Sequence, residues 1–190
     1  KINLLTSTKP NNTYATEKLF TENLLLSSNN NQLINLSILR LSPIYTNKFS
    51  GDINLLINYL RTQLPIIATI FPNKRSFINS IDLNDLIIKI INYNKPLNNI
   101  FLVSENYDVS SEEIIKELKK SFSSNSVLVK LPLNLVRFLF FIKLFPKFLE
   151  SLFFSKRLDI SDTVSTFNWF PKNNILNLIK KNNDNKQKIS

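Results

Sequence analysis

A tyrosine and a lysine stand four positions apart near the start of the chain, in the stretch from Pro10 to Lys18. Residues with this spacing share one face of a helix, so the ammonium of Lys18 would lie beside the phenol of Tyr14. A phenol acts as a base near neutrality only when its phenolate is stabilised by roughly 4 kcal/mol, and an adjacent fixed cation can supply this. The pair is therefore a candidate for proton transfer, although the spacing also fits two solvated residues on a helix.

The composition restricts which other side chains could do such chemistry. The 190 residues contain no His and no Cys, which excludes thiolate metal sites, disulfides and the most usual general base. We therefore expect no metal, and Tyr, Lys or a carboxylate must move protons. The single glycine excludes a glycine-rich phosphate-binding loop. Because the chain also lacks Met, we expect that part of the protein lies upstream.

The chain is basic, with a formal charge of +10 and a pI near 9.8. Such a charge raises the question of nucleic-acid binding. The basic residues are spread along the sequence, however, and are densest only between Lys180 and Lys188, which reads as a frayed polar tail. We therefore expect no nucleic-acid partner. A hydrophobic content of 43% with a mean hydropathy of −0.05 indicates a globular protein, which we expect to be cytoplasmic.

Helical and strand-like patterns alternate along the chain, as in α/β proteins. The helix that carries the Tyr-Lys pair is expected to end near Ser27, and a buried strand is expected from Leu33 to Leu41. Asp82 is expected to cap a later helix, and Ser110 with Glu113 forms a capping-box pattern. The remaining expected elements are helices at 53–64, 82–92 and 112–122 and strands at 66–71, 75–81, 100–103 and 126–129.

The segment from Leu131 to Phe154 is the most apolar part of the chain. Charged residues such as Arg137 and Lys143, together with Pro146, interrupt it, so a membrane-spanning helix is not expected. A basic amphipathic helix with aromatic side chains also suits a membrane surface. We favour a buried or partner-covered helix. Membrane docking of a non-catalytic basic module through residues 131–154 is the alternative function.

Taken in order, these features resemble the C-terminal part of the NAD-dependent epimerase/dehydratase family, which are extended short-chain dehydrogenases/reductases. Within that family the chain is similar to UDP-glucose 4-epimerases and to UDP-N-acetylhexosamine 4-epimerases or 4-reductases. The resemblance rests on stretches that occur in the family's order, which are Pro10 to Glu22, Ile38 to Tyr45, Asn73 to Leu86, Phe101 to Glu113, and Leu158 to Pro171.

The resemblance implies specific roles for five residues. Tyr14 would be the acid/base that exchanges a proton with the sugar hydroxyl while hydride passes between a sugar carbon and the nicotinamide. Lys18 would hydrogen-bond the nicotinamide ribose, and Leu41 replaces the Pro or Tyr that usually lies near the nicotinamide. Arg75 would contact the nucleotide diphosphate, unless it is a surface residue at a strand start. Asp52 stands about where an Asn often contacts the sugar nucleotide.

The resemblance also implies the architecture and the partners. The expected fold is α/β, with residues 1–45 ending a doubly wound Rossmann-type sheet, 46–181 forming mainly a smaller mixed α/β substrate domain, and 182–190 forming a polar tail. NAD or NADP is the implied cofactor, a UDP-sugar the substrate and a homodimer the assembly. The resemblance implies reaction at C4 of the sugar, and both epimerisation and net reduction stay open. The chain alone is expected to be inactive and to bind NAD poorly in calorimetry.

Overall fold

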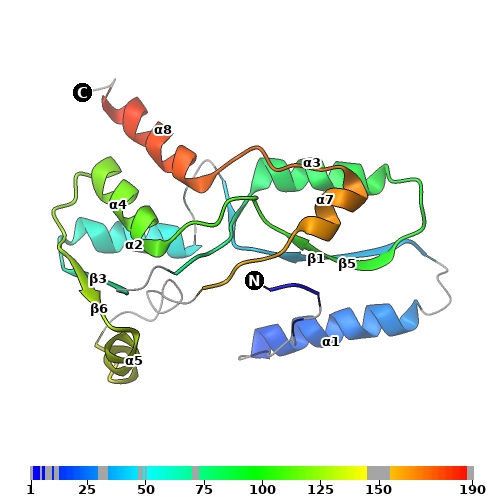
Figure 1. Cartoon of the computed structure of the whole chain (residues 1–190), viewed down its shortest axis with the longest axis horizontal. Coiled ribbons are helices and arrows are strands. Elements are labelled where there is room, and N and C mark those ends of the chain that lie inside the picture. The colour runs from blue at the N-terminus through cyan, green and yellow to red at the C-terminus, as the bar shows by residue number, and fades with distance from the viewer. Residues whose placement is uncertain are drawn as a thin grey trace.

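The computed structural model describes residues 2–4, 6, 10, 13–29, 34–46, 49, 51–69, 73–144 and 155–187. Helices alternate with short parallel strands along it (Figure 1), so the predicted α/β class is confirmed. The helices are α1 (Thr13–Ser28), α2 (Gly51–Arg61), α3 (Ser80–Ile91), α4 (Ser111–Ser121), α5 (Leu133–Phe141), α7 (Ser161–Phe167) and α8 (Ile175–Gln187). The strands are β1 (Leu36–Leu41), β2 (Ile44–Tyr45), β3 (Ile66–Thr69), β4 (Ile78–Asn79), β5 (Asn98–Val103) and β6 (Leu128–Leu131).

Each strand pairs with one that lies much further along the chain. β1 runs parallel to β5, with Leu36 opposite Asn98 and Leu41 opposite Val103. β2 pairs with β4, and β3 pairs with β6, both in parallel. Parallel pairing requires long crossovers, and the helices supply them. In Figure 1, α1 runs below the β1–β5 pair while α3 and α7 lie above it, so this pair has helices on both sides.

Two separate groups of buried apolar side chains stabilise the fold. The first lies among α2, β3, α4 and α8, and the second lies beneath α3 and α7, next to β5. Trp169 is fully buried in the second group, where the rings of Phe101 and Phe167 meet edge to face with centroids 4.8 Å apart. These two buried apolar groups hold in place the strands whose ends border the candidate site. The predicted division at residue 45 stays a prediction.

The helix starts show one confirmed prediction and one error. At α4 the Ser110 side chain accepts a hydrogen bond from the Glu113 backbone N–H (3.1 Å), and the Glu113 carboxylate accepts from the Ser110 backbone N–H (2.7 Å), as a capping box requires. At α3 the predicted cap, Asp82, is wrong. Asn79 caps this helix by accepting from the Ile81 backbone N–H (2.8 Å). The helix begins at Ser80, two residues before its predicted start, so the strand predicted at 75–81 ends at Asn79. This strand also begins later than predicted, at Ile78.

Among the residues that the structure describes, four other than glycine hold the left-handed backbone conformation, each close after a helix. They are Gln63, Ser123, Lys143 and Asn168, with φ between 44° and 60°. This position after a helix usually carries glycine, which has no Cβ to clash. A chain with one glycine fills it with other residues and accepts a local steric cost, which is about 1–2 kcal/mol for an ordinary side chain.

Other boundaries differ modestly from the predictions. β1 begins at Leu36 and is half-buried rather than fully buried, and Leu33 lies outside the described residues. α8 continues to Gln187, into the stretch predicted as a frayed tail. The apolar segment begins at the last residue of β6 and continues through α5, while residues 145–154 lie outside the described part. In the portion of the chain that the structure describes, no helix has the length and apolarity needed to cross a bilayer.

Candidate active site

The first helix presents Tyr14 and Lys18 on one side, beside the stripe that faces the sheet. Half-buried residues recur at Ala15, Leu19 and Glu22, which is the helical period of an amphipathic face lying on β1. Tyr14 lies one position before that stripe, and 69% of its surface is exposed. The Lys18 ammonium nitrogen lies 5.6 Å from the centroid of the Tyr14 ring. The predicted juxtaposition of phenol and ammonium is therefore confirmed.

Both side chains line a groove of about 720 Å³ between α1 and β1. Leu41, at the carboxyl end of β1, lines the same groove and is 40% exposed. Three of the predicted site residues are thus brought together. Ligands of open α/β sheets bind beyond the carboxyl ends of the strands, and Leu41 marks that end here. Much of the remaining wall is apolar, with Leu19, Leu25, Ile38 and Leu39 among the lining residues.

An ion pair fastens the helix to the strand beneath this groove. The Arg40 guanidinium donates from Nε to Glu22 Oε2 (2.9 Å) and from Nη2 to Glu22 Oε1, which is the two-pronged geometry of an arginine–carboxylate pair. The hydrogen-bonded Glu22 carboxylate raises the pKa of Arg40. Their side chains are only 11% and 26% exposed, so water screens this pair less than a surface pair. The contact fixes where α1 lies relative to the end of β1.

We expect Glu22→Gln to lower the free energy of unfolding by about 1–2 kcal/mol, because the variant loses a charge-assisted, two-pronged contact. A double-mutant cycle with Arg40→Met, measured by urea unfolding, should give a coupling energy of similar size. Glu17→Gln, at an exposed position of the same helix, is the control and should change stability little. A coupling energy of zero would show that the pair does not hold the helix.

The two predicted substrate residues meet at a second, smaller cavity of about 80 Å³. Arg75 is 4% exposed, so the alternative of a surface arginine is wrong. Burial lowers the pKa of its guanidinium, and the charge of the nearby Asp52 carboxylate opposes that shift. The Arg75 guanidinium lies over the Phe77 ring, 5.8 Å from its centroid. This cavity includes Pro43, two residues after the end of β1, so both cavities border the same short segment.

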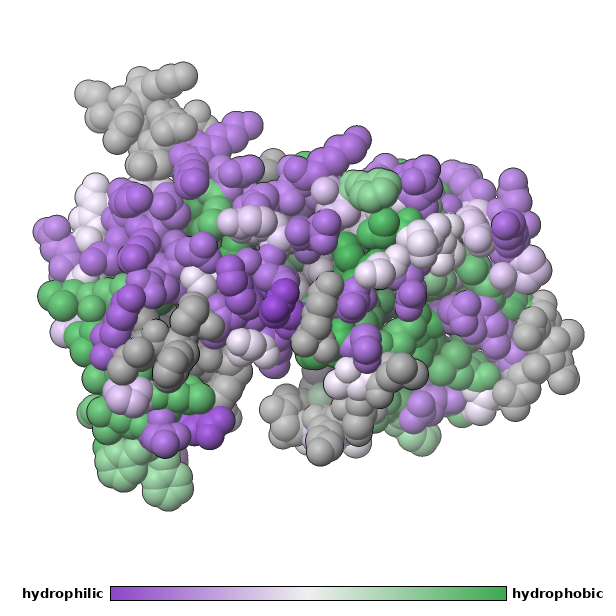
Figure 2. Space-filling view, viewed as in Figure 1, coloured by the Kyte–Doolittle hydropathy of each residue, from purple (hydrophilic) through white to green (hydrophobic). Residues whose placement is uncertain are grey.

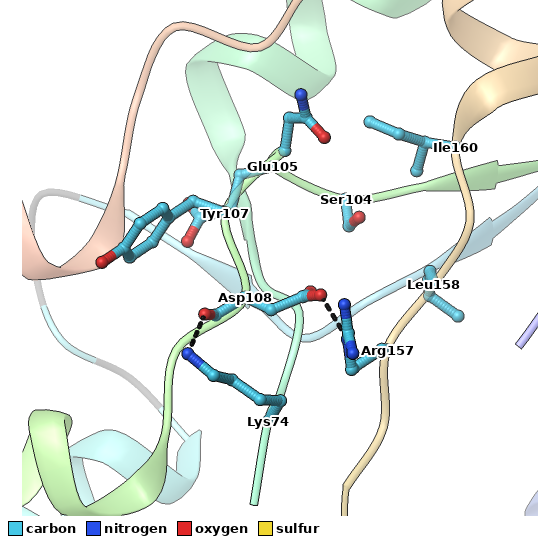
Figure 3. A pocket seen from close by; sticks show the side chains of 9 residues that line it. Lys74, Ser104, Glu105, Tyr107, Asp108, Arg157, Leu158 and Ile160 are labelled. Atoms are coloured by element: carbon cyan, nitrogen blue, oxygen red, sulfur yellow. Dashed lines mark hydrogen bonds and ion pairs between the residues drawn. The ribbon is translucent and has the colours of Figure 1, made fainter. Parts of the chain in front are cut away.

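A third cavity, of about 300 Å³, was not predicted (Figure 3). At its floor the Asp108 carboxylate accepts from Arg157 Nε (2.7 Å) and from the Ser76 hydroxyl (2.6 Å). The ammonium of Lys74 donates to the Asp108 backbone carbonyl (3.3 Å). Figure 3 shows Lys74 and Arg157 on either side of Asp108. The polar run 104–108, directly after the apolar strand β5, is a sequence signal for this part of the lining, whereas nothing in the sequence links it to Lys74 or Arg157.

Glu105, from that same run, is a buried carboxylate that joins distant elements. It is 1% exposed, accepts from the Tyr45 hydroxyl (2.6 Å) and lies 3.4 Å from the Ile175 backbone N–H, which donates to it at the start of α8. Burial raises the pKa of Glu105 to about 7, against the opposing effect of the Tyr45 hydrogen bond. Burial, with the charge of Glu105, also raises the pKa of Tyr45.

A buried aspartate on α3, Asp82, also binds the loop that precedes α8. The Asp82 carboxylate accepts from the backbone N–H groups of Lys172 (3.2 Å) and Asn173 (2.8 Å). Among the described residues, no group of three or more His, Cys, Asp or Glu side chains could hold a metal ion.

Comparison with known proteins places this geometry in context. No protein-family model matches the chain. The chain is 28% identical over 165 residues to the UDP-glucose 4-epimerase of Vibrio cholerae, an alignment that covers 85% of the chain and 50% of that protein. The chain thus spans about half the length of the curated relative that it matches. The predicted resemblance to such an epimerase is confirmed, and coverage of half of the relative is consistent with the predicted C-terminal part.

Solved structures share the fold at lower sequence identity. The UDP-glucuronic acid 4-epimerase of Bacillus cereus, solved with NAD, superimposes with a TM-score of 0.71 at 17% identity, covering 99% of the chain and 56% of that protein. WbmG of Bordetella bronchiseptica, solved with NAD and UDP, gives 0.69 at 18% identity, covering 98% and 53%. The UDP-N-acetylglucosamine 4-epimerase of Bacillus cereus gives 0.68 at 13% identity, covering 96% and 57%. These likenesses confirm the predicted Rossmann-type fold.

Proposed function

We propose that this chain supplies the catalytic Tyr-Lys pair and the substrate domain of an NAD(P)-dependent nucleotide-sugar epimerase or reductase. The observation that supports this most directly is the convergence of Tyr14, Lys18 and Leu41 on one groove at the carboxyl end of β1. The similarity to a UDP-glucose 4-epimerase gives the reaction class. Residues 1–45 would then end the dinucleotide-binding domain, and residues 46–181 would form most of the substrate domain.

Tyr14 would exchange a proton with the hydroxyl on the reacting sugar carbon. Its exposed phenol opens into the groove, so a bound sugar can reach the hydroxyl. Lys18 would stabilise the phenolate electrostatically, because its ammonium lies beside the ring. The Glu22–Arg40 pair would hold both groups at a fixed place over β1, since it joins their helix to the strand.

The groove's residues suit a nicotinamide and its ribose. An apolar wall can lie against a flat ring, and a lysine ammonium can donate to ribose hydroxyls. The bound nicotinamide would supply the hydride acceptor that no side chain of this chain provides. The phosphate-binding glycine loop is not encoded within these 190 residues, so they would contact only the nicotinamide side of the cofactor.

The UDP-sugar would extend from this groove toward the second cavity. Arg75 presents a buried guanidinium there, a group suited to a diphosphate, and Asp52 could accept from a sugar hydroxyl. We also propose a homodimer through α1, whose outward side exposes Phe20 (68%) and Leu24 (53%). Apolar side chains gathered on one helix face are typical of a covered surface.

The reaction class can be tested with the whole protein, UDP-glucose and NAD. NMR spectroscopy should show the configuration at C4 approaching equilibrium without net loss of NAD if the protein is an epimerase. A reductase would be identified with a UDP-4-keto-sugar and reduced nicotinamide in place of these two compounds, by one reduced nicotinamide oxidised for each ketone converted to a hydroxyl. UDP-N-acetylglucosamine is the second substrate to compare. The proposal is wrong if neither nucleotide sugar changes and neither binds in calorimetry.

A further inference from the structure

The helix α5 carries apolar side chains on both of its long sides. One side packs into the first buried group through Val136, which is 1% exposed, with Leu139 and Phe140 partly buried next to it. The other side exposes Phe138 (56%) and Phe141 (84%) on the surface. A helix with large apolar side chains on two sides leaves one of these sides without cover from its own core. The exposed apolar positions of this segment are Leu135, Phe138, Phe141, Ile142 and Leu144, and we call them the α5 patch.

A hydrogen-bonded turn holds the end of this patch in place. After the helix, Lys143 N–H donates to the Phe140 carbonyl (3.0 Å) and Leu144 N–H donates to the Leu139 carbonyl (3.1 Å). This pattern, with Lys143 in the left-handed conformation, is the Schellman motif. The turn therefore presents Ile142 and Leu144 as fixed parts of the surface. An ordered patch loses little conformational entropy when it binds.

The charges around the α5 patch are all positive within its own segment. From residue 131 to residue 144 the sequence contains Arg137 and Lys143, both exposed, and no Asp or Glu. Lys130, one residue before this segment, pairs with Glu112 of α4 (2.8 Å), which also pairs with Lys116 (2.7 Å). The chain as a whole carries +10. Cations around exposed aromatic side chains complement an anionic lipid surface.

The place of α5 in the molecule allows such a contact. Figure 1 shows α5 at the lower left of the molecule, below β3 and β6. In Figure 2 its apolar side chains form a protrusion at the lower corner of the molecule. A flat bilayer could therefore meet the patch before the rest of the surface. We propose that the α5 patch docks on the surface of a bilayer that contains anionic phospholipid, with the helix lying in the interface.

Vesicle co-sedimentation of the full chain tests this proposal. The chain should sediment with vesicles of equimolar phosphatidylglycerol and phosphatidylcholine and much less with phosphatidylcholine alone. Phe138→Asp with Phe141→Asp should lower the partition coefficient roughly tenfold or more, because two apolar anchors are lost. The matched control is Ile88→Asp with Ile91→Asp, two exposed residues at the same spacing on α3, and it should bind as the unchanged chain does.

The charge contribution has its own variant. Arg137→Gln with Lys143→Gln should reduce binding to anionic vesicles by about fivefold per cation and leave the weak binding to neutral vesicles unchanged. Tyr14→Phe should have no effect, which separates this surface from the groove. Circular dichroism verifies that each variant is folded.

Three results would overturn the proposal. One is a failure of the unchanged chain to sediment with anionic vesicles. Another is an equal loss of binding in the α3 control and the α5 variant. The third is a concentration-dependent dimer that α5 substitutions abolish while vesicles are not bound, since a second copy of the chain would then cover the patch.

Discussion

Replacing Tyr14 by phenylalanine should lower the turnover number of the whole protein by roughly 10²–10⁴-fold, the usual contribution of a positioned acid/base. The variant loses only a hydroxyl, from a residue that lines a groove and is 69% exposed instead of supporting the core. We therefore expect the free energy of unfolding and the affinity for NAD to stay almost unchanged. Steady-state kinetics with a UDP-sugar, together with calorimetry for NAD, would measure both.

Two further variants sharpen this result. Tyr59→Phe is the matched control, because its hydroxyl donates to the Pro65 carbonyl (2.9 Å) and does not line the groove. It should lose some stability and keep its turnover. Lys18→Met should weaken NAD binding as well as turnover, since the ammonium would serve both the ribose and the phenolate. Retained turnover in Tyr14→Phe would assign the proton transfer to another group.

The stability of the chain should fall as the pH rises from 4.5 to about 7, because of Glu105. The folded state raises the pKa of this carboxyl from 4.5 to about 7, mainly by burying it. Over that interval the unfolded chain loses the proton while the folded chain retains it, so ionisation favours unfolding. Each pKa unit corresponds to about 1.4 kcal/mol, which gives a loss of about 3 kcal/mol across the interval. Above pH 7 this contribution should level off.

Urea unfolding at the two ends of this interval would measure the effect. Glu105→Gln removes the titrating group while keeping an acceptor for the Tyr45 hydroxyl, so its stability should depend much less on pH. The negative charges of the nearby Asp82 and Asp108 carboxylates raise the pKa of Glu105 further. Glu117→Gln, at a half-buried α4 position whose carboxylate pairs with Lys120 (3.0 Å), is the control and should keep the dependence of the unchanged chain. An equal dependence in Glu105→Gln would assign the titration elsewhere.

Local sequence signals predicted most of the elements correctly. The capping box at Ser110 and the apolar run before it placed α4 and β5 within about two residues. The i, i+4 spacing of Tyr14 and Lys18 was enough to predict that both side chains meet on one helix face. Such predictions succeed because the interactions that decide them lie within one helical turn. The wrong cap at Asp82 shows that such local signals can be ambiguous. Asn79, three residues earlier, is an equally good cap, and it is the residue that caps α3.

The contacts that join distant segments could not be predicted. The Tyr45–Glu105 hydrogen bond spans 60 positions, and the Asp82–Asn173 contact spans 91. Neither residue pair has a spacing that distinguishes it, because only the tertiary fold brings the partners together. The same holds for the third cavity, where Lys74, Asp108 and Arg157 come from three separate segments. The resemblance to a family supplied the roles of Arg75 and Asp52, and the structure then brought them to one cavity.

The most direct test is an experimental structure of the whole protein with NAD and a UDP-sugar bound. We expect the Tyr14 hydroxyl within about 2.6–3.2 Å of the hydroxyl on the reacting sugar carbon. The Lys18 ammonium should contact the nicotinamide ribose, with the ring in the groove between α1 and β1. A nicotinamide bound elsewhere, or a Tyr14 phenol directed away from both ligands, would contradict the proposed site.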